Sequence, residues 1–110
     1  MSFQLSYYNE TVEVELDAWP VGLRARFRAL TIRMIEYGPN LGMPHTRALG
    51  NGLFEIRAKA EEGIGRVFFC TVVGRKIVIL HSFIKKTDKT PKRELNIALT
   101  RQKEVISHEL

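Results

Sequence analysis

Cationic side chains suited to phosphate binding recur in the stretch LFEIRAKAEEGIGRVFF, residues 53–69. If its first half is an extended strand, Glu55, Arg57 and Lys59 point to one face, because side chains alternate along a strand. Arg66 follows on the expected partner strand. Neighbouring like charges are destabilising unless an anion joins them, and the planar fork of Arg binds two phosphate oxygens at once. The stretch therefore predicts a phosphate-binding face. The simpler alternatives are a solvated outer face, or a guanidinium of Arg57 or Arg66 that Glu55 orients.

Imidazole and aromatic side chains are expected on the same face. His81 is a candidate general acid or base because imidazole titrates near neutrality, and a structural histidine in a strand is the alternative. Phe68 and Phe83 could stack on an unpaired base, as aromatic side chains do in the recognition of single-stranded RNA. Packing in the core beneath the last helix is the alternative for both. His45 and His108 are weaker candidates for such a role.

A second basic group follows in the segment KKTDKTPKRE, residues 85–94. Its first two lysines leave the end of a strand next to the hairpin, so they are expected to converge with the cations of the first stretch. The segment is either a solvated loop and helix start or a loop that follows a phosphate backbone. Its candidate cations are Lys85, Lys86, Lys89, Lys92 and Arg93.

Two helices are predicted to precede these strands. After a first strand over residues 3–8, Asn9 can cap a short helix that ends at Pro20 and places Val12, Leu16 and Trp19 on one stripe. A second helix then begins at Asp17 or Pro20 and ends before Gly38-Pro39. Its apolar stripe consists of Leu23, Phe27, Leu30 and Met34.

The rest of the chain changes to the period-two pattern of strands. Strands are predicted over residues 45–49, 53–59, 64–73 and 76–84, with turns at Gly50-Asn51-Gly52, residues 60–63 and Gly74-Arg75. Thr90 and Pro91 resemble the N-cap and first position of a last helix that runs to about Ile106. The order of elements predicts an α+β domain with helices on an antiparallel sheet. The expected face toward the first two helices carries Phe54, Ile56, Val67, Phe69, Val78 and Leu80.

Composition restricts the class of protein. A chain of 110 residues is expected to form one domain over residues 1–110, with a tail from about residue 105 that can be disordered. Seventeen Lys and Arg against twelve Asp and Glu give a net charge of +5, which favours a polyanionic partner. The single cysteine, Cys70, excludes an intrachain disulfide, and we expect it to be a buried apolar residue. No apolar run has the roughly 18 residues of a membrane span and no signal peptide is evident, so we expect a cytosolic protein.

The ordered set YGPNLGMPHTRALGNGLFEIRAK, GRVFF and HSFIKKTDKTPKRE resembles the RelE/ParE superfamily of type II toxins, in its phage-derived, HigB-like branch. The resemblance covers about residues 3–104. It implies a RelE-like fold with an N-terminal strand, a helical hairpin, a twisted antiparallel sheet and a C-terminal helix. It also implies a ribosome-dependent endoribonuclease that cuts mRNA in the decoding site, and a helix-turn-helix antitoxin as its partner.

The resemblance implies roles for individual residues in metal-free cleavage by a ribose 2′-hydroxyl. Arg57 and Arg66 would stabilise the phosphate and the transition state, and Lys59 and Lys85 would transfer protons or position the substrate. His81 is the optional acid or base, and the RNA contacts would be Lys86, Lys89, Lys92, Arg93 and Phe83. The sequence offers no metal-ligand spacing and no cofactor motif.

Two other classes of function fit the same fold. Some related toxins inhibit gyrase and do not cut RNA, and a plain nucleic-acid-binding module would share the basic face. A folded but inert toxin is a third possibility. A neighbouring gene for a small helix-turn-helix protein would support a toxin of either kind. The set of Arg57, Lys59, Arg66 and Lys85 favours the nuclease over a gyrase inhibitor.

Overall fold

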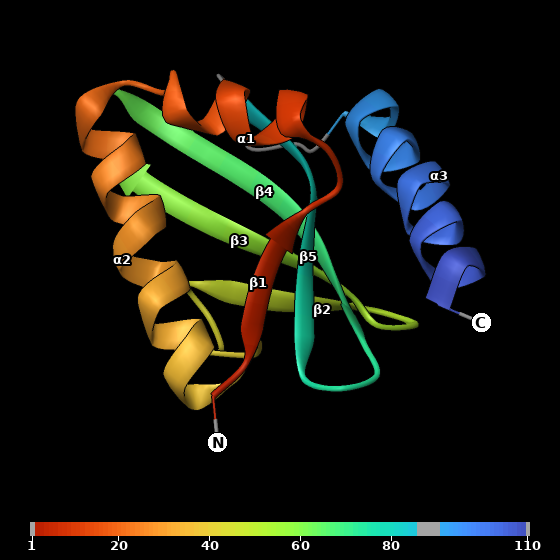
Figure 1. The fold of residues 1–110 in the computed structure, drawn as a ribbon. Coiled ribbons are helices and arrows are strands. Elements are labelled where there is room, and N and C mark those ends of the chain that lie inside the picture. Colours follow the sequence, from red (N-terminus) through yellow and green to blue (C-terminus); the bar gives the residue numbers. More distant parts are fainter. Residues whose placement is uncertain (1, 86–90, 110) are drawn as a thin grey trace.

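The structure is a computed structural model that describes residues 2–85 and 91–109. Five strands and three helices follow one another in a mixed order (Figure 1). Candidates Lys86 and Lys89, together with the expected cap Thr90, lie outside the described residues. The elements are β1 (Gln4–Tyr7), α1 (Glu10–Asp17), α2 (Val21–Tyr37), β2 (Thr46–Gly50), β3 (Leu53–Ala60), β4 (Gly63–Val72), β5 (Lys76–Lys85) and α3 (Lys92–Glu109).

All five strands form one sheet in the order β1-β5-β4-β3-β2. Strands β2 to β5 are antiparallel neighbours, and β1 joins the edge of the sheet parallel to β5. The helices α1 and α2 cover one face, while α3 covers part of the other (Figure 1). The predicted α+β class, with an N-terminal strand, a helical hairpin and a C-terminal helix around the sheet, is confirmed.

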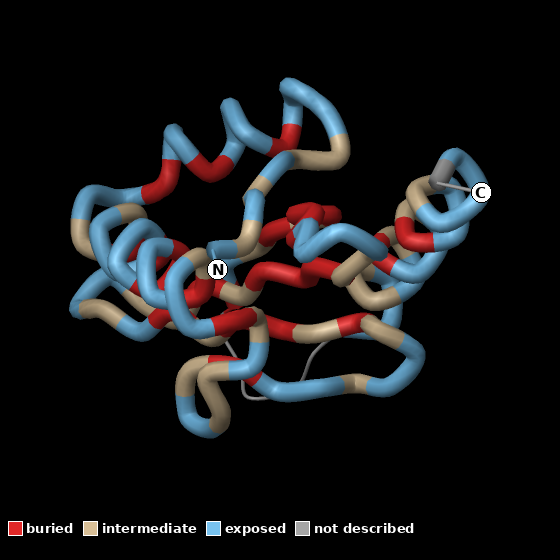
Figure 2. The backbone as a smooth tube through the Cα atoms, turned by 60° about the horizontal axis from the view of Figure 1, so that its bottom comes forward, coloured by how far each residue is buried: buried red, intermediate tan, exposed pale blue. Residues whose placement is uncertain are grey.

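The larger core lies between the sheet and the first two helices, where buried residues gather (Figure 2). The stripe predicted on α2 is buried: Leu23 and Leu30 are fully enclosed, and Phe27 and Met34 lie beside them. The predicted cap also forms, because the side chain of Asn9 accepts a hydrogen bond from the backbone N–H of Val12. Amphipathic patterning and one capping residue therefore suffice to place the helical hairpin.

A close approach joins this hairpin to the sheet. Trp19, in the connection between α1 and α2, is buried and contacts Phe27 edge to face, with ring centroids 6.1 Å apart. Its ring lies over Gly65 of β4, where an added Cβ would come within 2.5 Å of the indole. Glycine is required here because it leaves space for the ring, which allows the corner of the hairpin to sit directly on the strand.

The sequence-based prediction was wrong for the facing of Val78 and Leu80. Both lie in the smaller core under α3. Ile77 and Ile79 instead occupy the face toward α1 and α2, where Val78 and Leu80 were expected. The cause is a β-bulge: Phe68 pairs with His81, but the next residue of β4 pairs with Ile79, so that β5 carries one extra residue. A one-residue shift exchanges the faces of every side chain on one side of the bulge.

The last helix is longer than predicted. Helix α3 continues to Glu109, so residues 105–109 are helical and do not form a tail. Leu95, Ala98 and Val105 of this helix pack against β4 and β5. None of the helices in the described part of the chain is both long enough and apolar enough to cross a membrane.

Cys70 lies in the smaller core and is fully buried, as predicted. Burial raises the pKa of its thiol to about 11, so that only about one molecule in a thousand carries the reactive thiolate at pH 8. We expect iodoacetamide to leave the native protein unlabelled at pH 8 over hours, and to label Cys70 within minutes in denaturant. Labelling of the native protein at the rate of a free cysteine would show that α3 detaches readily from the sheet.

Candidate functional site

The pairing of β3, β4 and β5 arranges the predicted cations in rows across one sheet face. Arg57 lies directly opposite Arg66, and Arg66 lies opposite Phe83. In the next row Ile64 separates Lys59 from Lys85. Two arginines side by side on adjacent strands are electrostatically unfavourable without a compensating anion. The strand register thus creates a site with an excess of positive charge.

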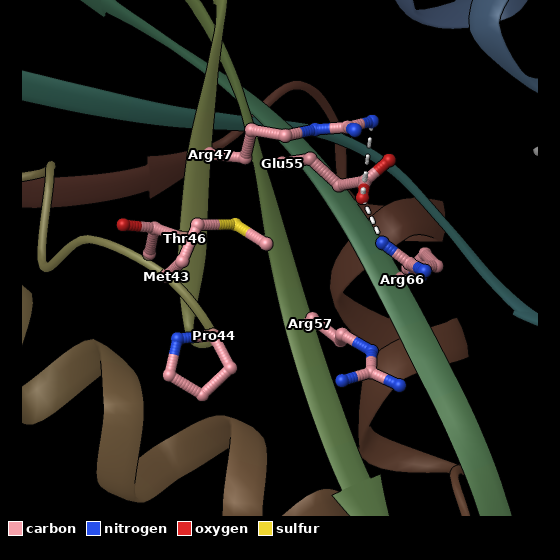
Figure 3. Close-up of a pocket in the computed structure, with 7 residues that line it drawn as sticks. All are labelled: Met43, Pro44, Thr46, Arg47, Glu55, Arg57 and Arg66. Atoms are coloured by element: carbon pink, nitrogen blue, oxygen red, sulfur yellow. Dashed lines mark hydrogen bonds and ion pairs between the residues drawn. The ribbon is translucent and has the colours of Figure 1, made fainter.

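A pocket of about 160 Å³ opens beside the arginine pair (Figure 3). One wall comes from the segment before β2 and from β2 itself, and the other from β3 and β4. We call it the arginine pocket. Its lining residues are Met43, Pro44, Thr46, Arg47, Glu55, Arg57 and Arg66.

Glu55 supplies the negative charge in the arginine pocket. Its side chain is only 2% exposed, and its Oε1 accepts a hydrogen bond from Nη1 of Arg66, whose side chain is 14% exposed. The same oxygen lies 3.9 Å from Nη2 of Arg47 (Figure 3). Among the described residues no carboxylate forms an ion pair with Arg57. The sequence left open whether Glu55 pairs with Arg57 or with Arg66, and in the structure it pairs with Arg66.

Three buried polar atoms in this pocket have no hydrogen-bond partner within the described part of the chain. They are Nε of Arg57, Nε of Arg66 and Oε2 of Glu55. Buried polar groups are normally paired because leaving one unsatisfied costs about 1–3 kcal/mol. Two unsatisfied guanidinium donors fit the oxygens of an anion, and the carboxylate oxygen can accept a hydrogen bond from a hydroxyl group.

Replacing Glu55 by Ala is expected to lower the free energy of unfolding by about 1.5–3 kcal/mol, the usual contribution of a hydrogen bond to a charged group. The change leaves Arg66 and Arg57 adjacent without a carboxylate. Urea denaturation measures the loss. The matched control is Asp17→Ala, which removes the exposed ion pair with Arg28 and should cost less than about 1 kcal/mol. Equal small losses would mean that the Glu55 pair contributes no more than a surface pair.

His81 is engaged by the last helix. Its Nε2 lies 2.6 Å from Oε2 of Glu94 in the first turn of α3, and its ring stacks on Phe83 with centroids 6.2 Å apart. Both groups are mostly buried, with side chains 13% and 23% exposed. This contact links α3 to β5 and engages Nε2 of His81. His81 therefore matches the alternative of a structural histidine in a strand.

The aromatic candidates lie inside the smaller core. Phe68 is fully buried, so the suggestion that it stacks on a base was wrong. Phe83 is half-buried and stacks on Phe68 at a centroid distance of 5.9 Å. Both side chains are shielded because α3 covers the end of this sheet face, which matches the alternative of packing beneath the last helix.

The remaining cationic candidates differ in exposure and in their position relative to the arginine pair. Lys59 is exposed and Lys85 is buried at the end of β5. Lys92 is exposed in the first turn of α3. Arg93 lines a different pocket with Tyr8 and residues of α3, so the structure does not bring it to the arginine pair.

Sequence reasoning missed Arg47 and the pocket wall at Met43, Pro44 and Thr46. Arg47 could have been found, because pairing the predicted strand over residues 45–49 with β3 puts it opposite Glu55. The wall depends on the path of the linker between α2 and β2. Linker paths have no periodic signal in the sequence, so this part required the structure.

Comparisons with known proteins agree with this architecture. The model of the family described as "Phage derived protein Gp49-like" matches residues 14–103. No curated protein gives a significant sequence match. A mutant of the Escherichia coli toxin RelE in the free state superposes with a TM-score of 0.58 at 12% identity, covering 92% of this chain and 98% of that one. The archaeal RelE–RelB complex from Pyrococcus horikoshii gives a TM-score of 0.58 at 20% identity, covering 78% and 98%. These likenesses establish a RelE-like fold.

Proposed function

The chain belongs to the family of phage-derived Gp49-like proteins, and on that premise we propose that it is the toxin of a type II toxin–antitoxin pair. Its activity would be that of an mRNA endoribonuclease acting in the decoding site of the ribosome. The fold shared with the toxin RelE supports this assignment, and the RelE–RelB complex is a precedent for a bound antitoxin. A helix-turn-helix antitoxin is the proposed partner here.

The proposed reaction needs no group from outside the RNA except proton carriers. The ribose 2′-oxygen attacks the adjacent phosphorus, a new O2′–P bond forms, and the P–O5′ bond breaks. The products are a 2′,3′-cyclic phosphate and a 5′-hydroxyl, so one proton leaves the 2′-oxygen and one reaches the 5′-oxygen. Negative charge grows on the non-bridging oxygens in the transition state, where fixed cationic donors are most effective.

The observation that carries this proposal is the pair of unsatisfied Nε donors on Arg57 and Arg66 in the arginine pocket. Both donors belong to guanidinium groups, which hold phosphate oxygens in two parallel hydrogen bonds. Glu55 positions Arg66, because its carboxylate takes one guanidinium nitrogen and leaves others for substrate. A phosphate in this pocket would also relieve the repulsion between the two arginines.

Proton transfer is assigned to lysines in this proposal. Lys59 and Lys85 lie in the row next to the arginine pair, and both become candidates for transferring a proton or positioning the RNA. Lys86, Lys89, Lys92 and Arg93 remain candidates for contacts to RNA beyond the cleaved bond.

Induced expression followed by mapping of RNA 5′ ends tests the function. We expect growth arrest together with cuts at fixed positions within codons of translated messages. Arrest with intact mRNA would overturn the nuclease and direct attention to gyrase. Absence of any arrest, with folded protein present, would indicate an inert member of the family.

A further inference from the structure

A second cationic pocket adjoins the arginine pocket. It has a volume of about 350 Å³, and two of its lining residues, Pro44 and Arg57, also line the arginine pocket. The others are Arg26 of α2, His45 before β2, and Lys59 of β3. We call it the flanking pocket. Arg57 therefore stands between two adjacent hollows and contributes to both.

The flanking pocket has cationic side chains and no carboxylate in its lining. Within the described residues, Arg26, Arg57 and Lys59 form no ion pair with Asp or Glu. Other arginines of α2 differ: Arg28 pairs with Asp17, and Arg24 donates to the backbone oxygen of the same residue. Uncompensated cations that converge on one hollow favour binding of an anion.

His45 completes the set of donors. Nη2 of Arg26 lies 3.3 Å from Nδ1 of His45, and because a guanidinium can only donate, Nδ1 is the acceptor. Desolvation, with Arg26 and Arg33 nearby, lowers the pKa of His45, which favours the neutral imidazole. Its proton then resides on Nε2, where it is a further donor.

We propose that the flanking pocket binds the RNA phosphate next to the one held in the arginine pocket. The inference rests on the proposed function and extends it: the strand would cross the cationic face from Arg66 past Arg57 toward Arg26 on α2. Two adjacent anion sites that share one arginine match a polymer with one charge on every unit. An acidic peptide is the competing ligand, and the experiment separates the two.

The test uses 2′-O-methyl RNA, which lacks the nucleophile and stays intact. Affinities are measured for a dinucleotide with a single phosphate and for a longer oligonucleotide. Wild type should bind the longer ligand more tightly. The variant Arg26→Gln should lose about tenfold or more in affinity for the longer RNA, the scale of hydrogen bonds to charged groups, and bind the dinucleotide as before. Its log–log salt slope should fall by about 0.7 for each phosphate that the variant no longer neutralises.

The matched control is Lys103→Gln, which removes the same charge from an exposed position outside both pockets. Equal weakening by this control would overturn the flanking site, and so would a wild type that binds both lengths equally well or binds neither. Tighter binding of an oligoglutamate peptide, sensitive to the Arg26 substitution, would assign the pocket to an acidic protein. The proposed function is tested separately. It fails if the wild type cuts no mRNA in cells, whatever its affinities for the oligonucleotides.

Discussion

Replacing Arg66 by Ala is expected to reduce mRNA cleavage about 10²–10³-fold, the usual loss when one preorganised charge-stabilising donor is removed from an active site. Arg66 is held by Glu55, lies opposite Arg57 and has an unsatisfied Nε in the arginine pocket. Its donors are therefore fixed in place before substrate arrives. The rate is measured as the appearance of cut ends in a translating extract, per molecule of protein.

Two companion variants make this result interpretable. Arg66→Lys keeps the charge and loses the planar fork, so its rate should stay much nearer to that of Arg66→Ala than to wild type. Lys103→Ala removes an exposed cation from α3 and should leave cleavage unchanged. A full rate in Arg66→Ala would remove this side chain from the site and leave the arginine pocket without a catalytic role.

The largest loss of stability is expected for Trp19→Ala. Removal of a buried Trp typically costs about 3–5 kcal/mol because lost burial and a residual cavity add together. Trp19 connects α1, α2 and β4 through its contacts with Phe27 and Gly65. Denaturant unfolding measures the effect, and Val14→Ala, an exposed apolar position on α1, is the control with an expected change within about 0.5 kcal/mol.

Gly65→Ala tests the same contact from the other side. A methyl group 2.5 Å from the indole must displace it, which should cost about 1–3 kcal/mol. Once Trp19 is already Ala, the added methyl fills part of the cavity, so the cost of Gly65→Ala should shrink or change sign. Additive losses in the double variant would mean that the two residues are not coupled.

The helices and strands could be predicted because each follows from a pattern of residues that are close together in the sequence. The stripe from Leu23 to Met34 and the cap at Asn9 are sufficient to define the helices. The face assignment of Val78 and Leu80 failed because a β-bulge shifts register without a local signal in the sequence. The parallel pairing of β1 with β5 was not specified either, because it depends on contacts between distant parts of the chain.

The site was predictable to the extent that it follows strand alternation. The common face of Arg57 and Arg66 follows from one well-formed hairpin. The partner of Glu55 was ambiguous because both arginines are within reach of a glutamate on that face. The burial of Phe68 and the contact of His81 with Glu94 depend on where α3 packs, and helix patterning identifies an apolar stripe without naming the surface that it covers.

The pairing of β1 with β5 at the edge of the sheet determines when the sheet can be completed during synthesis of the chain. Gln4 pairs with Lys76, so β1 leaves the ribosome well before its partner strand β5 has been made. Sheets closed by such distant pairs fold slowly compared with helical domains of similar size. During its own synthesis the chain passes through a stage in which the helical hairpin exists without the complete sheet.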